Sequence, residues 1–471
     1  MLDRVVVPDR LALICRDEES VAYNPNLNLW ERVDRDTAEA LRWLRAGRPR
    51  SELASHLARR FASDPGVAEE RLAAIVKWCV LRRILYLDQQ LNVSASGPDA
   101  TLSTVYWICT QACNLRCTYC YQEAAVARRD ELTTAEGFQL IDHAVAAGAD
   151  TFIFTGGEPF SRKDLLQLAR YSRGRGLRTN VITNGHFVTE KTAKDVAEAF
   201  HTITISLDHG IPEHHDRARG DGSWARAVRA IELLLGLGAD VDVNTVLSRY
   251  GLSDLQALLR FGRDHDLGQH KVVPQFPMGR GGGSREDELE PDELLALNDR
   301  MQQAERDLGP HEKRAGVEGE SSGKRQLRKH CGAGLSEVSV DPEGWVYPCK
   351  LLQYPQFRTD NVRTRLLADI FREHPVLNAT RARVVDTLHP CKTCIIKNQC
   401  GGGCRGIHFS FTQAYEQASP LFCAFLRSSF ESSLWAGSGA PVPARRSSYA
   451  VASGGPDAGA QPLLPASLLV R

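Results

Sequence analysis

Apolar and polar positions alternate through the middle of the chain in a pattern that predicts strands and helices in turn. Six short runs rich in β-branched and aromatic residues are predicted strands, at residues 104–109, 151–155, 178–183, 202–207, 241–247 and 270–275. Apolar residues recur at helical spacing between them, for example over residues 133–147, 161–173, 189–199, 224–235 and 254–264. This repetition predicts an α/β fold with a parallel sheet and right-handed crossovers. Six units are fewer than the eight of a closed barrel, so we expect a partial (β/α)6 TIM-like barrel over residues 102–280.

The first hundred residues follow a different pattern. Short β-like runs at residues 4–7, 11–16 and 20–23 are separated by turn signals. Helical spacing follows at residues 36–44, 51–61 and 69–81, and a β-like run closes the segment at residues 83–87. We therefore expect a winged-helix-like α+β domain over residues 1–95.

Beyond the predicted barrel the pattern becomes less regular. A glycine-rich stretch at residues 279–284 precedes an acidic helical segment near residues 291–307, which predicts a helical insertion and linker over residues 281–330. Residues 331–430 are rich in cysteine and form a further predicted domain. Residues 437–471, rich in Ala, Pro, Gly and Ser, predict a disordered tail.

Charge and hydropathy exclude several classes of function. The chain has 471 residues, with 58 Lys and Arg against 58 Asp and Glu. A neutral balance argues against a nucleic-acid surface, which needs clustered basic residues. No apolar run approaches the roughly 18 residues of a membrane span, and the first residues lack the order of a secretory signal. We expect a cytoplasmic protein that binds neither nucleic acid nor membrane.

Cysteine is the residue type that carries the chemistry. Of 13 cysteines, Cys113, Cys117 and Cys120 stand directly after the first predicted barrel strand, in the spacing CxxxCxxC. Three thiolates can hold three irons of a [4Fe–4S] cluster and leave the fourth iron without a protein ligand. A three-cysteine zinc site or chance core cysteines are the alternatives. Three other cysteines lie in apolar runs and are predicted core residues: Cys15, Cys79 and Cys109.

This spacing, with the aromatic Tyr119 before the last cysteine, resembles the signature of the radical S-adenosylmethionine (SAM) superfamily. Polar loops follow the next three predicted strands, with the sequences GGEP at residues 156–159, TNG at 183–185 and SLD at 206–208. Taken alone, each would be a simple turn. The resemblance implies that the three cysteines bind the SAM-cleaving cluster and that these loops bind SAM. The implied SAM-binding residues are Tyr119, Gly156, Gly157, Glu158, Pro159, Asn184, Ser206 and Asp208.

The C-terminal cysteines resemble the SPASM extension of radical SAM peptide-modifying enzymes, which holds two auxiliary [4Fe–4S] clusters. The resemblance implies that one cluster is bound by Cys391, Cys394, Cys400 and Cys423. It assigns Cys331, Cys349 and Cys404 to the other, for three clusters in all. Residues 321–330 contain no cysteine, so the second auxiliary cluster would have an open iron or a ligand such as His330. A zinc ribbon is the alternative, but it would leave three cysteines unexplained.

The first hundred residues, with Trp43 to Gly47 after a predicted helix, resemble the peptide-recognition domain of the PQQ-biosynthesis chaperone. That family binds a leader peptide as an added strand at a sheet edge beside a helix. A dimerisation or packing module is the alternative.

Together the resemblances imply a radical SAM/SPASM enzyme that matures a ribosomally made peptide (a RiPP maturase). It would use a 5′-deoxyadenosyl radical to install an oxidative cross-link, either a thioether or a carbon–carbon bond. Its implied partners are a precursor peptide and a reductant such as ferredoxin or flavodoxin. The alternatives are a sulfatase-maturating or quinone-cofactor oxidoreductase, and a non-catalytic iron–sulfur or zinc-binding protein.

Overall fold

The structure is a computed structural model that describes residues 2–16, 18–90, 100–283, 287–309 and 327–435. The predicted tail lies outside these residues, as do residues 284–286 and 310–326 of the predicted insertion and linker and most of the segment joining the first domain to the barrel. The domain limits drawn from the sequence stay predictions. No helix in the described ranges is both long enough and apolar enough to cross a membrane.

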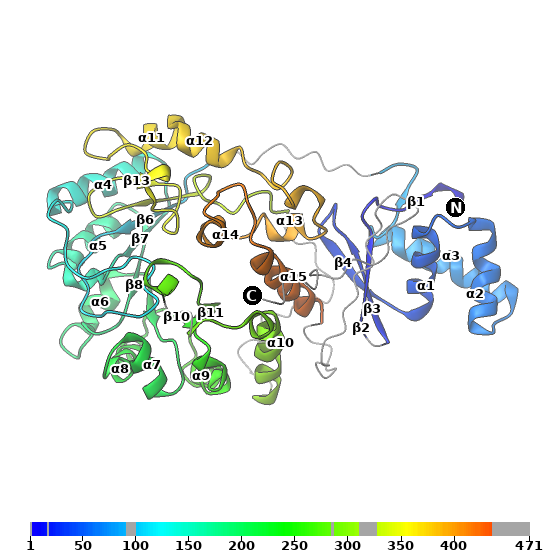
Figure 1. Ribbon diagram of the computed structural model, residues 1–471, viewed down its shortest axis with the longest axis horizontal. Coiled ribbons are helices and arrows are strands. Elements are labelled where there is room, and N and C mark those ends of the chain that lie inside the picture. Colours follow the sequence, from blue (N-terminus) through cyan, green and yellow to red (C-terminus); the bar gives the residue numbers. More distant parts are fainter. Residues whose placement is uncertain (1, 17, 91–99, 284–286, 310–326, 436–471) are drawn as a thin grey trace.

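A sheet of eight strands forms the centre of the larger body, in the order β11-β10-β9-β8-β7-β6-β12-β13 (Figure 1). The six predicted strands are all present and parallel: β6 (Thr104–Ile108), β7 (Thr151–Thr155), β8 (Arg178–Thr183), β9 (Thr202–Ser206), β10 (Val241–Leu247) and β11 (His270–Pro274). The helices between them are α4 (Thr134–Ala146), α5 (Leu165–Gly174), α6 (Ala193–Ala199), α7 (Pro212–Arg219), α8 (Ser223–Gly236) and α9 (Leu255–Asp264). The α/β class and the partial barrel are confirmed.

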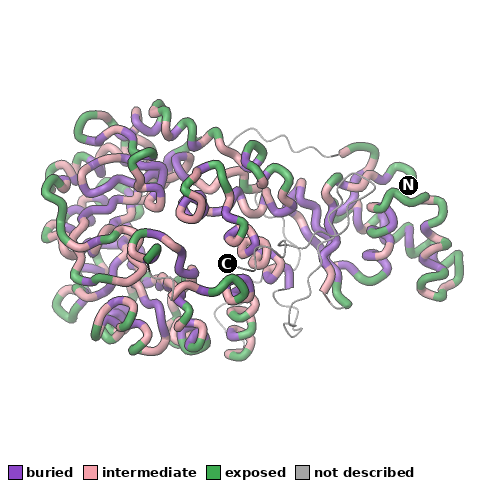
Figure 2. The backbone as a smooth tube through the Cα atoms, in the orientation of Figure 1, coloured by how far each residue is buried: buried purple, intermediate pink, exposed green. Residues whose placement is uncertain are grey.

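Buried and half-buried side chains alternate along the barrel strands, and this alternation separates the core from the barrel interior. In β10, Val241, Val243 and Leu247 are buried, whereas Asn244 and Val246 are half-buried and face a cavity. Successive side chains of a strand point to opposite faces of the sheet, so one face packs against the helices and the other is left for a ligand. The buried segments run through the whole barrel (Figure 2).

Two strands of the sheet come from the cysteine-rich region, which the sequence pattern did not predict. β12 (Glu337–Val340) pairs in parallel with β6, and β13 (Val346–Tyr347) pairs antiparallel with β12. The remaining helices are α10 (Pro291–Asp307), α11 (Leu367–Glu373), α12 (Pro375–Arg381), α13 (Lys397–Cys400), α14 (Arg405–Thr412) and α15 (Pro420–Leu434). The C-terminal domain is thus joined to the barrel through a continuous sheet.

The N-terminal domain has a three-stranded antiparallel sheet and three helices. The sheet has the order β2 (Ala12–Arg16), β3 (Glu19–Asn24) and β4 (Leu29–Val33). The helices are α1 (Arg35–Arg45), α2 (Leu53–Phe61) and α3 (Pro65–Leu81), and β1 (Val5–Val6) pairs with β5 (Tyr86–Leu87). Strand β4 was not predicted, because two charged residues, Glu31 and Arg32, interrupt its apolar pattern.

Both faces of this sheet are covered. Leu13 and Ala22 pack against α1–α3, whereas Ile14, Tyr23 and Trp30 on the other face pack against α13 and α15 of the C-terminal domain. The barrel and helices α1–α3 therefore lie at opposite ends of the molecule, with α13–α15 between them (Figure 1).

Candidate functional site

The three cysteines of the CxxxCxxC motif line one cavity of about 280 Å³ at the carboxyl ends of the barrel strands. Five of the predicted SAM-binding residues line the same cavity: Tyr119, Gly156, Gly157, Asn184 and Ser206. Burial raises the pKa of the Cys113 thiol to about 11. A metal would compensate for burying these sulfurs as thiolates, because metal ligation deprotonates a coordinating thiol.

The glycine pair after β7, Gly156 and Gly157, contacts the loop at residues 110–120, which carries the CxxxCxxC cysteines and is called the cluster loop below. A Cβ on Gly156 would be 2.6 Å from the carbonyl oxygen of Thr110, and Gly156 has φ +155°. The backbone N–H groups of Gly157 and Glu158 donate to the carbonyls of Thr110 and Ala112, both at 2.8 Å. Only glycine permits this close approach, and the bonds hold the backbone just before Cys113 in place.

Glu158 and Pro159 lie behind the cavity wall rather than on it. The fully buried Glu158 carboxylate accepts hydrogen bonds from the Thr183 hydroxyl at 2.7 Å and from the Asn184 N–H at 2.8 Å. Burial raises the pKa of Glu158 to about 7, although these donors oppose the shift. The structure therefore shows Glu158 orienting the loop that carries Asn184.

Asp208 is also behind the wall, where it holds two side chains that face the cavity. Its carboxylate accepts two hydrogen bonds from Arg219, at 2.5 and 3.1 Å, and one from the Tyr119 hydroxyl. Burial alone would raise the pKa of Asp208, but the guanidinium of Arg219 lowers it to about 2. Arg219 lines the cavity and could bind a carboxylate group there. Nothing in the sequence distinguished Arg219 from other arginines.

The glycine-rich stretch after β11, which the sequence predicted only as a breaker, belongs to the site. A Cβ on Gly279 would be 2.5 Å from the carbonyl oxygen of Cys120. Next to it, Arg280 donates from Nε to the carbonyl of Cys117 and from Nη1 to that of Ala124, both at 3.0 Å. A glycine run directly after the last barrel strand is the signal that could have identified this contact.

The C-terminal domain completes the cavity through Lys350, Leu351 and Ile407. Lys350 is half-buried, and the loss of solvent around its ammonium group lowers the pKa of that group; its Nζ lies 4.5 Å from the centre of the Tyr106 ring. Opposite, Gln275 is 4% exposed, and its side-chain oxygen and nitrogen have no partner among the described residues. Buried amides nearly always have partners, so Gln275 marks a place for a polar ligand.

The four cysteines assigned to one auxiliary cluster lie together. Cys391, Cys394, Cys400 and Cys423 line one small hollow. Burial, reinforced by the neighbouring sulfurs, raises the pKa of Cys400 to about 12. A set of four convergent sulfurs suits one [4Fe–4S] cluster.

In the second C-terminal set, Cys331 and Cys349 lie beside Cys404. Cys400 therefore belongs to one set of cysteines and Cys404 to the other. This arrangement does not match a zinc ribbon built on Cys391, Cys394, Cys400 and Cys404. His330 is already engaged: its Nδ1 accepts from the Gly332 N–H and its Nε2 lies 3.0 Å from the Thr380 carbonyl oxygen. This engagement argues against His330 as the fourth ligand.

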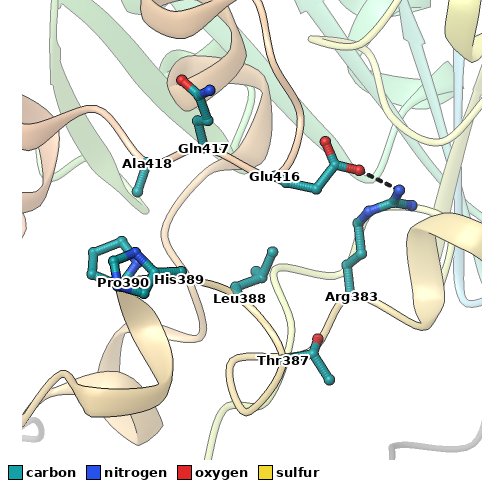
Figure 3. A pocket seen from close by; sticks show the side chains of 8 residues that line it. All are labelled: Arg383, Thr387, Leu388, His389, Pro390, Glu416, Gln417 and Ala418. Carbon is teal, nitrogen blue, oxygen red and sulfur yellow. Dashed lines mark hydrogen bonds and ion pairs between the residues drawn. The ribbon is translucent and has the colours of Figure 1, made fainter.

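A wider hollow on the surface of the C-terminal domain contains none of these residues (Figure 3). It is lined by residues 383, 387–390 and 416–418, with an ion pair between Arg383 and Glu416 at its rim. No cysteine lines it, so we place the chemistry in the cysteine-lined cavity of the barrel.

Comparison with known proteins assigns the chain to a family. Residues 107–262 match the radical SAM superfamily, and residues 331–395 match an iron–sulfur cluster-binding domain, SPASM. Mycofactocin maturase MftC of Mycobacterium ulcerans is 30% identical over 325 residues, covering 66% of this chain and 85% of that protein. AdoMet-dependent heme synthase of Methanosarcina barkeri is 27% identical over 342 residues, covering 68% and 96%.

Among solved structures, SuiB of Streptococcus suis bound to S-adenosylmethionine has the same fold, with a TM-score of 0.54. It is 17% identical and covers 88% of this chain and 98% of its own. The family match and the named maturase relatives exclude the non-catalytic alternative. The chain belongs to the radical SAM superfamily, carries a SPASM domain, and is a radical SAM enzyme.

Proposed function

We propose that this enzyme installs an oxidative cross-link, a thioether or a carbon–carbon bond, in a ribosomally made precursor peptide. The observation that carries the proposal is the N-terminal sheet, which is packed on the C-terminal domain with both faces covered and both outer edges unpaired among the described residues. Such a sheet can bind a further strand only at an edge, which is how an extended peptide is recognised.

Three groups of cysteines would hold three [4Fe–4S] clusters. Cys113, Cys117 and Cys120 would hold the first, which leaves one iron for SAM, and the two C-terminal sets would hold the others. When bound, these cofactors supply a 5′-deoxyadenosyl radical that abstracts hydrogen and an acceptor for the electron that the substrate loses.

The protein itself would bind and orient SAM. Gly156 and Gly157 offer backbone close to the cluster loop, and Asn184 and Ser206 offer polar side chains to SAM. Arg219, held by Asp208, offers a cation to the methionine carboxylate. Because Leu351 and Ile407 cover this space from the C-terminal domain, they exclude water from the reacting atoms.

The peptide would enter the same cavity beside Gln275 and Lys350. The free amide of Gln275 can both donate to and accept from a peptide backbone, and Lys350 can bind a carbonyl or a carboxylate. A leader bound at the N-terminal sheet would raise the local concentration of the core segment, so the cavity need bind the core only weakly.

The N-terminal domain favours this reaction over the alternatives. A sulfatase-maturating or small-molecule activity could use the barrel and the clusters, but it gives no role to a strand-binding sheet beside Cys394 and Cys400. The reducing cytoplasm suits free thiolate ligands and would supply ferredoxin or flavodoxin as reductant.

The test combines the reconstituted enzyme, SAM, a reductant and short peptides encoded next to its gene, without oxygen. We expect 5′-deoxyadenosine together with a peptide product that has lost two hydrogens per cross-link, located by tandem mass spectrometry. Cys117→Ala should abolish both products, and Cys109→Ala, a change at a buried cysteine outside the three sets, is the matched control. Formation of 5′-deoxyadenosine without modification of any neighbouring peptide would contradict the peptide substrate but not the radical chemistry.

A further inference from the structure

Two histidines and an aspartate from the connections after β9 and β10 direct ligand atoms at one another outside the cysteine-lined cavity. His209 follows β9, His214 lies on α7 and Asp254 precedes α9. The Nδ1 atoms of His209 and His214 are each 3.6 Å from a carboxylate oxygen of Asp254, Oδ1 and Oδ2 respectively. One ligand atom from each residue lies within 4.8 Å of the others.

Three of these four atoms lack hydrogen-bond partners among the described residues. The separation of 3.6 Å is too long for a hydrogen bond. Nδ1 of each histidine and Oδ1 of Asp254 are without a partner among the described residues. The side chains of His209 and Asp254 are only 1% exposed. Because buried polar atoms are nearly always paired, three that converge in this way indicate a shared ligand.

A tetrahedral metal ion fits the distances and the donor types. Zinc bonds to nitrogen and oxygen are about 2.0–2.1 Å long, so that ligand atoms of a tetrahedral site lie about 3.3–3.4 Å apart. The two separations of 3.6 Å, one to each carboxylate oxygen of Asp254, are close to this value, and one ligand atom from each residue lies within 4.8 Å of the others. Calcium and magnesium prefer all-oxygen sites, whereas imidazole suits zinc. We propose that His209, His214 and Asp254 bind a zinc ion, with a fourth position left for water.

The surroundings already orient two of the three ligands, His209 and Asp254. Ser248 Oγ lies 3.3 Å from Nε2 of His209, which leaves Nδ1 of that ring for the metal. The backbone N–H of Ile211 donates to Oδ2 of Asp254 at 3.0 Å. Gly251 lies against the His209 ring, and a Cβ there would be 3.1 Å from Nδ1. The side chain of His214 is 30% exposed, which gives an ion a path of entry.

The role of this site is positioning rather than catalysis. Helix α7, which carries His214, also carries Arg219, whose guanidinium holds Asp208 beside the barrel cavity. A zinc ion bound also by Asp254 would fasten α7 to the start of α9 and so stabilise the wall of the SAM site from behind. The site is independent of the substrate and of the cysteine sets.

The test uses the full-length enzyme with its clusters reconstituted, incubated with zinc chloride and then freed of unbound metal. We expect one zinc per chain by elemental analysis, and zinc-edge X-ray absorption showing nitrogen and oxygen neighbours at about 2.0–2.1 Å. His214→Ala should weaken zinc binding at least about tenfold, and zinc should raise the melting temperature of the wild type but not of this variant. His389→Ala, at an exposed histidine, is the matched control.

Iron and sulfide content, measured in parallel, shows that each variant is folded; His214→Gln replaces His214→Ala if the latter fails this check. Zinc neighbours that are sulfur at about 2.3 Å would place the ion on cysteines and overturn the proposal. Failure of the wild type to retain zinc, or equal retention by the folded variant, would overturn it as well.

Discussion

At the residue scale, Gly157 decides how closely the loop after β7 approaches the cluster loop. A Cβ at this position would overlap the carbonyl group of Ala112, which is backbone and cannot turn aside. Gly157→Ala should therefore push the loop away from Cys113 and reduce SAM cleavage more than tenfold, measured as 5′-deoxyadenosine formed. Gly174→Ala is the matched control, because nothing lies within 4 Å of a Cβ there. Equal activity of the two variants would contradict the close approach.

Asp341, in the turn between β12 and β13, predicts a pH dependence of stability. Burial raises its pKa from the ordinary 3.8 to about 6. Between these values the folded protein keeps a proton that the unfolded chain has released, so the contribution of this residue to stability falls as pH rises from 3.8 to about 6. Asp341→Asn can still accept the N–H bonds of Glu343 and Trp345. It should gain stability relative to the wild type by about 1–1.5 kcal/mol on going from pH 5 to pH 7.5.

Thermal unfolding of the anaerobic protein across this pH range measures the difference. Asp130→Asn, which removes an exposed carboxylate, is the control. A constant difference for Asp341→Asn would show that the Asp341 carboxylate titrates as it does in water.

At the element scale, α15 joins the N-terminal sheet to the cysteine domain. Phe430 on this helix is 5% exposed, and its ring centre lies 5.0 Å from that of Tyr23 on β3. Phe430→Ala should cost about 3–5 kcal/mol, the usual cost of truncating a buried phenylalanine. Urea unfolding followed by near-ultraviolet circular dichroism measures the loss. Leu81→Ala, at a position 72% exposed on α3, should have almost no effect.

The same contact predicts a functional consequence. Cys394 and Cys400 pack against the group of buried apolar side chains that contains Phe430. Asn28 of the N-terminal domain donates to the Oε1 of Gln399 at 2.8 Å. Loosening α15 should therefore make the auxiliary cluster that we propose at this site easier to lose. Iron release to a chelator should be faster in Phe430→Ala than in Leu81→Ala. Equal rates would mean that the sheet and this cluster site are mechanically independent.

At the scale of the whole molecule, the N-terminal sheet and the barrel lie on opposite sides of α13–α15 (Figure 1). If the leader binds at the sheet, a peptide without its leader loses the tether but keeps the reacting residues. We expect kcat/KM for the leaderless peptide to fall by about 10²–10⁴, while 5′-deoxyadenosine formation without peptide is unchanged. A leaderless peptide that is processed as well as the full one would assign the N-terminal domain a packing role.

The order of strands and helices in the barrel could be read from the sequence because each strand is a short β-rich run and each helix has its own period. The sequence also predicted the cysteine motif of residues 113–120, because ligand spacing within one loop is local. Strand β4 could not be predicted, because Glu31 and Arg32 interrupt its apolar pattern and only pairing with β3 makes this segment a strand. Arg219, Gln275 and Lys350 carried no local signal, and only folding brings them to one cavity.

The sequence by itself determined the family of chemistry, because a metal cluster needs particular donor atoms at short, fixed spacings along the chain. Only the tertiary structure decided which residues face the cavity and which support it: Glu158 and Asp208, expected to contact SAM, lie behind the wall and orient Asn184 and Arg219. It also brought His209 and Asp254 together across two strand–helix units. Contacts between distant segments depend on how elements pack, and one-dimensional spacing does not record packing.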